Sequence, residues 1–126
     1  MKRILLAAIA VLSFNAMAHT QSPGHIIDDW VYKEVNSYEF TLVNRNEYVA
    51  SYSILVGNYN PKTGLMENEK KLGTIENLEY NEGVKFNVDI RVPPATKRQA
   101  LMCTELVNEN VSYRSRVCSL LELTRK

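Results

Sequence analysis

The chain has two cysteines, Cys103 and Cys118, and their spacing favours a structural disulfide. The spacing differs from the C-x-x-C motif of redox sites, and no histidine lies near either cysteine in the sequence, which argues against a metal–thiolate site. Two cysteines allow only one pairing. In the chain-entropy model, closing a loop of about 15 residues contributes about 3 kcal/mol.

The two histidines, His19 and His25, are the residues that could bind a metal. If His19 is the first residue of a processed chain, its amine and imidazole could together chelate copper. The alternative function is therefore a small-ligand or copper-binding periplasmic protein that uses His19. Such a site needs a second histidine on the folded domain, and the rest of the chain has none. We therefore expect His19 to lie at a frayed terminus and expect no cofactor.

The composition argues against an enzyme. No histidine is available in the predicted core to act as a base for a serine or cysteine nucleophile. Glu76, Glu79 and Glu82 are spaced as a solvated strand and turn, with no apolar pocket implied around them. There is no glycine-rich phosphate loop, zinc cluster or calcium-loop spacing.

Residues 1–18 have the features of a secretory signal peptide. Lys2 and Arg3 precede an apolar run too short to span a bilayer, and Ala16-Met17-Ala18 is a small-x-small cleavage site. Cleavage would leave a chain that begins at His19 in the periplasm or outside the cell, with no further membrane span. Its 13 bases and 14 acids nearly cancel, which gives no argument for binding nucleic acid.

Residues Val84 to Val92 form the clearest predicted strand, because apolar residues occupy every second position. Asn81-Glu82-Gly83 forms a turn before it, and Pro93-Pro94 ends it. We expect a domain over residues 26–126, with other strands in residues 26–35, 38–42, 48–56 and 72–80. Residues 19–25 read as a flexible leader, and Gly57 to Glu69 reads as a long polar loop.

The last two apolar segments, within residues 98–123, are predicted to form a hairpin around Asn108-Glu109-Asn110. In that hairpin Cys103 lies opposite Cys118, Glu105 opposite Arg116, and Val107 opposite Arg114. The alternative is a helix, since these segments also contain good helix formers at helical spacing. The total is about seven strands, which predicts an all-β, immunoglobulin-like antiparallel β-sandwich with one disulfide.

The order of these segments resembles a bacterial immunoglobulin-like sandwich. The resemblance lies in Tyr38–Asn44, Tyr52–Val56 and Tyr80–Gly83, followed by the Val84–Val92 strand and Pro93. Within that class it is distantly similar to the periplasmic chaperone domains of pilus assembly, which donate an edge strand to an incomplete subunit. This chain has one domain where those proteins have two, and their carboxylate-anchoring Arg and Lys have no matching positions here. The resemblance therefore implies a fold and a compartment, and no site residues.

These observations predict an exported, non-enzymatic, protein-binding domain, an accessory or chaperone-like component of an envelope or appendage assembly. Its partner would be a protein of the cell envelope. A structural subunit that associates with itself is a further hypothesis. The contact residues would come from the last strand, its basic neighbours and the Gly57–Glu69 loop. They are Arg114, Arg116, Val117, Ser119, Leu121, Leu123 and, as the best exposed tyrosine, Tyr59.

The charges of the chain are unevenly distributed. Residues 19–90 contain six bases and eleven acids, whereas residues 91–126 contain seven bases and three acids. Chance differences between solvated strand faces explain such an imbalance. The alternative is a basic edge that meets an acidic partner or a carboxylate.

Overall fold

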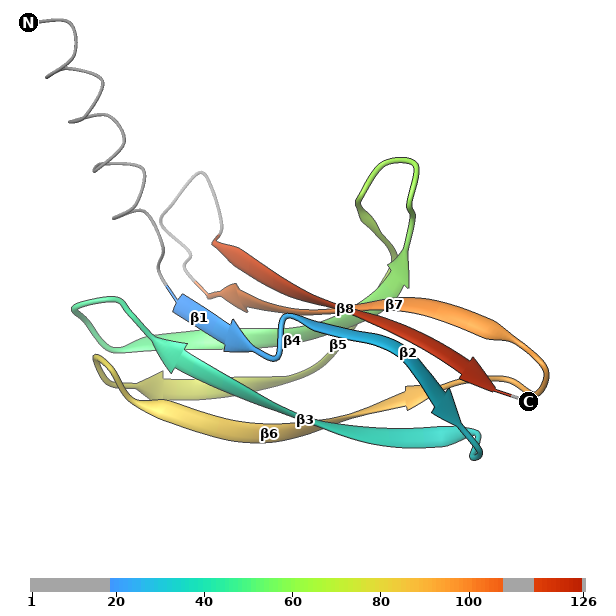
Figure 1. Cartoon of the computed structure of the whole chain (residues 1–126). Helices are drawn as coiled ribbons and strands as arrows, with labels where there is room; N and C mark the ends of the chain where they lie inside the picture. The colour runs from blue at the N-terminus through green and yellow to red at the C-terminus, as the bar shows by residue number, and fades with distance from the viewer. Residues whose placement is uncertain (1–18, 108–114, 126) are drawn as a thin grey trace, which may run out of the picture.

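A computed structural model describes residues 19–107 and 115–125, and it shows an all-β protein built from two sheets (Figure 1). The described residues form eight strands. Their bounds are β1 His19–Ser22, β2 His25–Val31, β3 Val35–Asn44, β4 Ala50–Tyr59, β5 Met66–Leu78, β6 Gly83–Arg91, β7 Lys97–Leu106 and β8 Arg116–Arg125.

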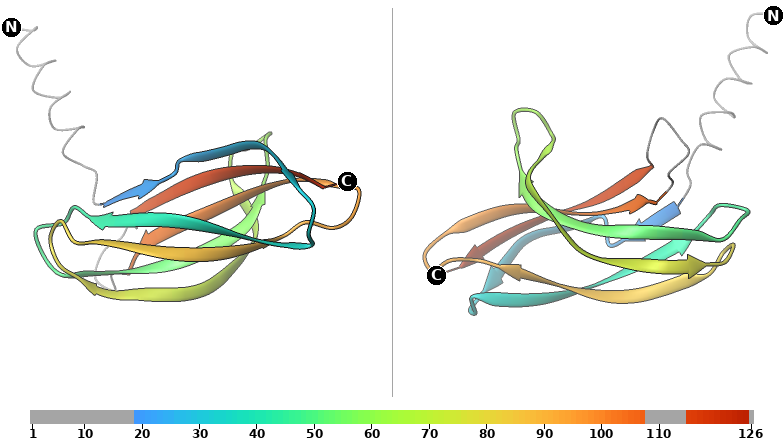
Figure 2. Two further views of the ribbon diagram at one scale, coloured as in Figure 1. Left: turned by 60° about the horizontal axis from the view of Figure 1, so that its bottom comes forward. Right: turned by 180° about the vertical axis from the view of Figure 1, so that it is seen from behind.

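The strands divide into a three-stranded sheet of order β1-β3-β6 and a five-stranded sheet of order β2-β8-β7-β4-β5. The views in Figures 1 and 2 show the two sheets face to face, with the β4–β5 hairpin bending away from the three-stranded sheet. Adjacent strands are antiparallel except β2 and β8, which run parallel. The prediction of about seven antiparallel strands is therefore corrected: the described residues alone form eight strands, and one pair in the larger sheet is parallel.

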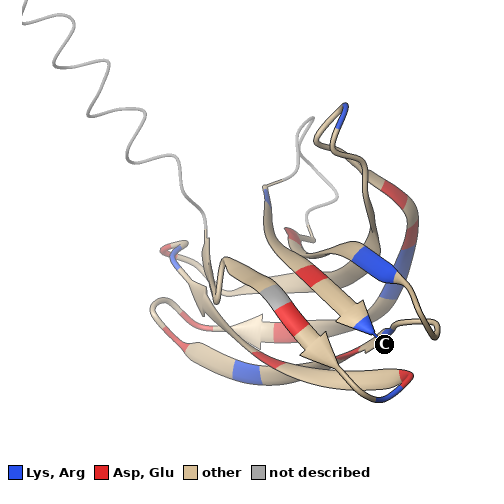
Figure 3. Cartoon of the chain, turned by 45° about the vertical axis from the view of Figure 1, so that its right-hand side comes forward, with Lys and Arg blue, Asp and Glu red and all other residues tan. Residues whose placement is uncertain are grey.

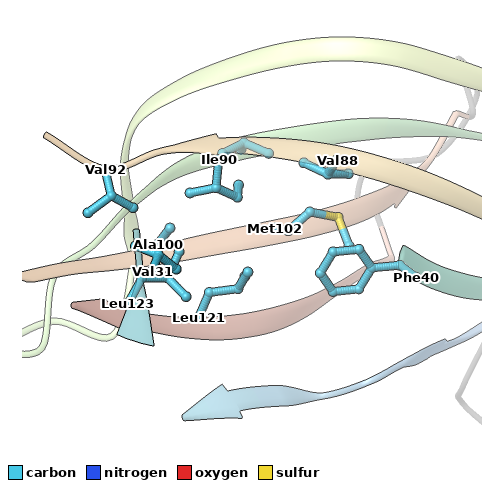
Figure 4. Packing of buried hydrophobic residues seen from close by; sticks show 10 residues of the cluster. Val31, Phe40, Val88, Ile90, Val92, Ala100, Met102, Leu121 and Leu123 are labelled. Carbon is cyan, nitrogen blue, oxygen red and sulfur yellow. The ribbon is translucent and has the colours of Figure 1, made fainter. Parts of the chain in front are cut away.

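The core lies between the sheets, where the inward-facing residues of both meet (Figure 4). The predicted alternation of Val84–Val92 is confirmed: Val88, Ile90 and Val92 are buried against β7 and β8. A second buried cluster surrounds Tyr52 at the other end of the sandwich. Buried apolar area of this kind supplies most of the free energy that favours folding.

The hairpin predicted for the last segments is confirmed over its described residues. β7 and β8 pair with Cys103 opposite Cys118, and these two residues form the disulfide. Glu105 lies opposite Arg116, and the two side chains form an ion pair of 2.8 Å. The helical alternative is wrong for the described part of residues 98–123. The predicted pairing of Val107 with Arg114 falls outside the described residues.

The segment expected to be a flexible leader is instead part of the sandwich, so that prediction is wrong. Residues His19–Ser22 form β1, which pairs with the end of β3, and His25 begins β2. The chain thus crosses from one sheet to the other between Ser22 and His25. Residues 26–35, expected as one strand, are divided: β2 ends at Val31 and β3 begins at Val35.

The predicted loop from Gly57 to Glu69 is also corrected, because most of it is strand. β4 continues to Tyr59 and β5 starts at Met66, which leaves only residues 60–65 as a connection. Gly57 allows the two strands to bend closely together. A Cβ atom at this position would overlap Met66 Cγ and lie 2.6 Å from the Glu67 carbonyl oxygen, so a larger residue would force the strands apart.

Candidate functional site

The five-stranded sheet ends on each side in an edge strand, β2 or β5, and each edge has no described strand beyond it. Such an edge presents unpaired backbone N–H and C=O groups that can pair with another chain. Sequence and geometry therefore decide which edge is open to a partner.

β5 has the features of a protected edge. Five of its thirteen residues are charged, with both signs present (Figure 3). Its pairing with β4 is interrupted by three register shifts, and Asn68 and Asn77 have positive φ angles of 53° and 57°. Charges, bulges and local bends of this kind discourage further strand pairing.

β2 has fewer of these features, and its pairing with β8 shifts register only once, between Ile26 and Asp29. Its sequence, HIIDDWV, contains two aspartates and no lysine or arginine. Ile27 and Trp30 remain 59% and 55% exposed, although both are large and apolar. Their neighbours Ile26 and Val31 pack against the core, so the exposed pair lies on the opposite, outer face of the sheet.

The exposed apolar surface continues into the turn after β2. Tyr32 is 83% exposed and Val35 is 44% exposed. We call Ile27, Trp30, Tyr32 and Val35 the aromatic patch. An open hollow of about 440 Å³ lies beside it, lined by residues 29–33 and 35–38. Exposed apolar residues gathered in this way mark interaction surfaces, and Trp and Tyr are enriched where proteins bind one another.

The hollow has a fixed polar wall. The Tyr38 hydroxyl donates a hydrogen bond of 2.7 Å to Asp29 Oδ2. Burial, this hydrogen bond and the charge of Asp29 together raise the pKa of Tyr38 far above its ordinary value, so the hydroxyl stays protonated. On the far side of the turn, Glu34 forms an exposed ion pair of 3.1 Å with Arg91. The carboxylate of Asp29 is therefore held in place beside the patch.

The residues predicted as contacts on the last strand are mostly interior. Ser119, Leu121 and Leu123 are fully buried. From Leu120 onward, β2 pairs with β8 along one side of it. Val117 is half-buried, and Arg114 lies outside the described residues. A parallel strand from the N-terminus therefore occupies this side of β8, and the binding role predicted for the last strand stays a prediction.

Arg116 has a structural role, because it forms two ion pairs with acidic residues of other strands. Its guanidinium donates to Glu105 at 2.8 Å and also contacts Glu69 of β5 at 3.1 Å. Since β4 and β7 separate β5 from β8 in the sheet, the pair with Glu69 requires β5 to bend over the outer face. Arg116 therefore pairs with two carboxylates and links the bent β4–β5 hairpin to β8.

The bent hairpin covers a small apolar group that we call the outer cluster. Leu55, Leu101 and Cys103 are buried in it, and Tyr59 and Met66 pack against them. Tyr59, expected to be the best exposed tyrosine, is therefore half-buried, and Tyr32 is far more exposed.

His19 is buried, which places it differently from the accessible terminus that the copper hypothesis requires. Its Nε2–H donates to the carbonyl and hydroxyl oxygens of Thr104, each at 3.1 Å, and its ring contacts Tyr52 with 4.5 Å between centroids. Burial lowers its pKa, partly opposed by the bond to Thr104. Among the residues the model describes, no group of three or more His, Cys, Asp or Glu side chains is arranged to hold a metal.

The polar side chains of β1 connect the two sheets. Gln21 Nε2 donates to Ser119 Oγ at 2.6 Å, and Thr104 Oγ1 donates to Gln21 Oε1 at 2.6 Å. Ser119 Oγ in turn donates to the Pro23 carbonyl oxygen at 2.6 Å. This network explains why Ser119 is buried and why the polar N-terminal segment is ordered.

Trp30 and Tyr32 were not among the contact residues predicted from the sequence. The available indication was the pair Asp28-Asp29 directly before Trp30, since acidic residues are rare in a buried strand. The break after Val31 has no glycine or proline to mark it, so the turn that exposes Tyr32 was not predicted.

Within residues 19–107 and 115–125, no helix is long and apolar enough to cross a membrane. Comparison with known proteins found no matching family model and no similar curated protein.

Proposed function

We propose that this chain is an exported, non-enzymatic domain that binds a protein of the cell envelope, as an accessory or chaperone-like component of an envelope or appendage assembly. The observation that supports this most directly is the exposure of Trp30 and Ile27 beside the open edge of β2. A disulfide is consistent with an oxidising compartment outside the cytoplasm.

The finer fold assignment, an immunoglobulin-like sandwich, is part of this proposal. In that fold strands B and E share one sheet, while C, F and G share the other. The pairing of β3 with β6, and of β7 with both β4 and β8, follows the same order. The disulfide joins β7 to β8 within one sheet, unlike the antibody arrangement, in which it joins the two sheets.

The proposed mechanism is strand addition. An extended segment of the partner pairs with the free backbone groups of β2, and its alternate side chains meet Ile27 and Trp30 on the outer face. Backbone hydrogen bonds supply affinity regardless of sequence, whereas the aromatic patch supplies selectivity. A large aromatic side chain that becomes buried at the centre of an interface often contributes more than 2 kcal/mol.

The test is capture of partners from the native cell envelope by the oxidised protein, scored by mass spectrometry. We expect Trp30→Ala to weaken capture of a stoichiometric partner by about tenfold or more. Ile27→Lys should weaken it similarly, because a lysine on an edge strand discourages pairing. Tyr80→Ala is the matched control, since Tyr80 is 54% exposed and lies outside the patch.

Trp30 also provides a direct readout, because it is the only tryptophan in the chain. Partner binding at the patch should shift its fluorescence emission to shorter wavelength as water is excluded. Equal capture by Trp30→Ala, Ile27→Lys and the unaltered protein would contradict the proposal. Concentration-dependent sedimentation without any other partner would instead favour self-association.

A further inference from the structure

A second open hollow, separate from the aromatic patch, lies where β7 begins beside the end of β4. Its volume is about 490 Å³, and Asn58, Tyr59, Lys97, Arg98 and Gln99 line it. We call it the basic hollow, because its two charged lining residues are both cations.

Arg98 is held in the wall of this hollow by neutral groups alone. Its Nη1 donates to the Arg91 carbonyl oxygen at 2.7 Å, and its Nη2 donates to Asn58 Oδ1 at 3.2 Å. Partial burial lowers the pKa of its guanidinium. A guanidinium carries five N–H donors, so three remain after these two bonds.

The neighbouring acids do not neutralise the two cations. Across the described residues, neither Arg98 nor Lys97 forms an ion pair. Two acidic residues lie opposite lining residues in the strand pairing, and both bond to neutral side chains. Glu122 accepts a hydrogen bond of 2.9 Å from Gln99, and Glu67 accepts one from Asn60. The hollow therefore keeps an uncompensated positive charge in a partly desolvated position, which an anion would stabilise.

We propose that the basic hollow binds an oxyanion, the phosphate or carboxylate group of a small ligand. The guanidinium of Arg98 offers paired N–H donors of the geometry that both groups accept, and Lys97 adds a mobile second charge. Because Asn58 and the Arg91 carbonyl fix the guanidinium beforehand, little side-chain entropy is lost when the anion binds. The basic hollow shares no residue with the aromatic patch, so the proposal of anion binding does not rest on the proposal of a protein partner.

The test is nuclear magnetic resonance titration of the oxidised protein with inorganic phosphate and, separately, with citrate at constant ionic strength. We expect saturable shifts of the Lys97, Arg98 and Gln99 backbone amides and of the Arg98 Nε–H. A response to phosphate alone would assign a phosphate ligand, and a response to citrate alone would assign a carboxylate ligand.

The main variant is Lys97→Gln, because Lys97 makes no side-chain bond that supports the fold among the described residues. Loss of one charge-assisted contact should weaken binding by about tenfold. Arg98→Lys keeps the charge and removes the paired donors, so it should weaken binding as well. Arg45→Gln is the control: Arg45 is an exposed arginine bonded to Asn81 Oδ1 and lies outside the hollow.

The proposal is overturned if neither anion gives saturable shifts at these residues. It is also overturned if Arg45→Gln weakens binding as much as Lys97→Gln, because the attraction would then be a general effect of net charge. Trp30→Ala should leave the titration unchanged, which separates this site from the protein-binding surface.

Discussion

The two edges of the five-stranded sheet differ in length, charge and regularity: the pairing of β5 shifts register three times and that of β2 once. β5 is long, carries charges of both signs and bends out of the sheet, whereas β2 is short and exposes Ile27 and Trp30. Both edges end the same sheet and face the same solvent. Charges and bulges discourage strand addition, so the strand addition that we propose would take place at β2 rather than at β5.

The supports of the two edges differ as well. β2 rests on β8, whose inward residues Leu121 and Leu123 are fully buried. The bent half of β5 instead rests on the outer cluster and on the ion pair between Glu69 and Arg116. We therefore expect perturbation of the core to affect β2, and perturbation of surface charge to affect β5.

The largest expected effect follows from removing the apolar support under β2. Leu121→Ala should lower the free energy of unfolding by about 2–5 kcal/mol, because it deletes a buried side chain and leaves a cavity. Leu72→Ala on β5 should change it by less than about 0.5 kcal/mol, since Leu72 is 46% exposed. Urea unfolding followed by circular dichroism measures both. Similar losses from the two variants would remove the distinction between the edges.

A smaller effect should come from acid, through His19 on the strand that leads into β2. Because burial lowers the pKa of His19 below its ordinary value of 6.5, the unfolded chain binds a proton at a higher pH than the folded chain does. Stability is therefore full above pH 6.5 and falls as the pH decreases from there towards the pKa of the folded state. The loss is limited to about 1.4 kcal/mol per pH unit.

Urea unfolding between pH 5 and 8 tests this dependence, with His19→Gln as the comparison. The variant should show a flatter profile below pH 6.5. Hydrogen exchange should also show β1 and β2 opening at acid pH before β5 does. A parallel pH profile in the two proteins would mean that His19 is not the group that titrates.

The smallest effect is expected at β5. Glu69→Gln removes half of the contact between Arg116 and its two carboxylates, and we expect a loss of about 0.5–1 kcal/mol with faster amide exchange in residues 66–71. Glu39→Gln is the control, because the pair of Glu39 with Lys85 is longer, at 3.9 Å, and more exposed. Unchanged exchange in residues 66–71 would show that apolar contacts alone hold the hairpin.

Features encoded by local sequence were predictable. The alternation of Val84–Val92 identified a strand with one buried face, and the polar turn between two apolar segments set Cys103 opposite Cys118. The ion pair of Glu105 with Arg116 followed from the same register. In each case the pattern lies within one strand or one hairpin, so no distant part of the chain was needed to interpret it.

Features that depend on distant residues were not predictable. The local sequence around His19 and Gln21 indicates a loose polar terminus. Their hydrogen-bond partners, Thr104 and Ser119, lie more than 80 positions away in the sequence. The local sequence of β8 likewise does not indicate that β2 pairs with it in parallel. Exposure of Trp30 follows from that pairing, because it fixes which face of β2 points outward. The sequence therefore directed the contact prediction to the last strand, whereas β2 is the edge strand of the sheet in the described residues.

The disulfide has a consequence for the continuity of the chain. Cys103 and Cys118 are joined across a sequence separation of 15, and the connection between β7 and β8 lies wholly inside that closed ring. A protease that cuts within the ring leaves two pieces that are still covalently linked, so β8 remains attached to the rest of the sandwich. Cleavage between the two cysteines would therefore not release β8, the strand that supports β2.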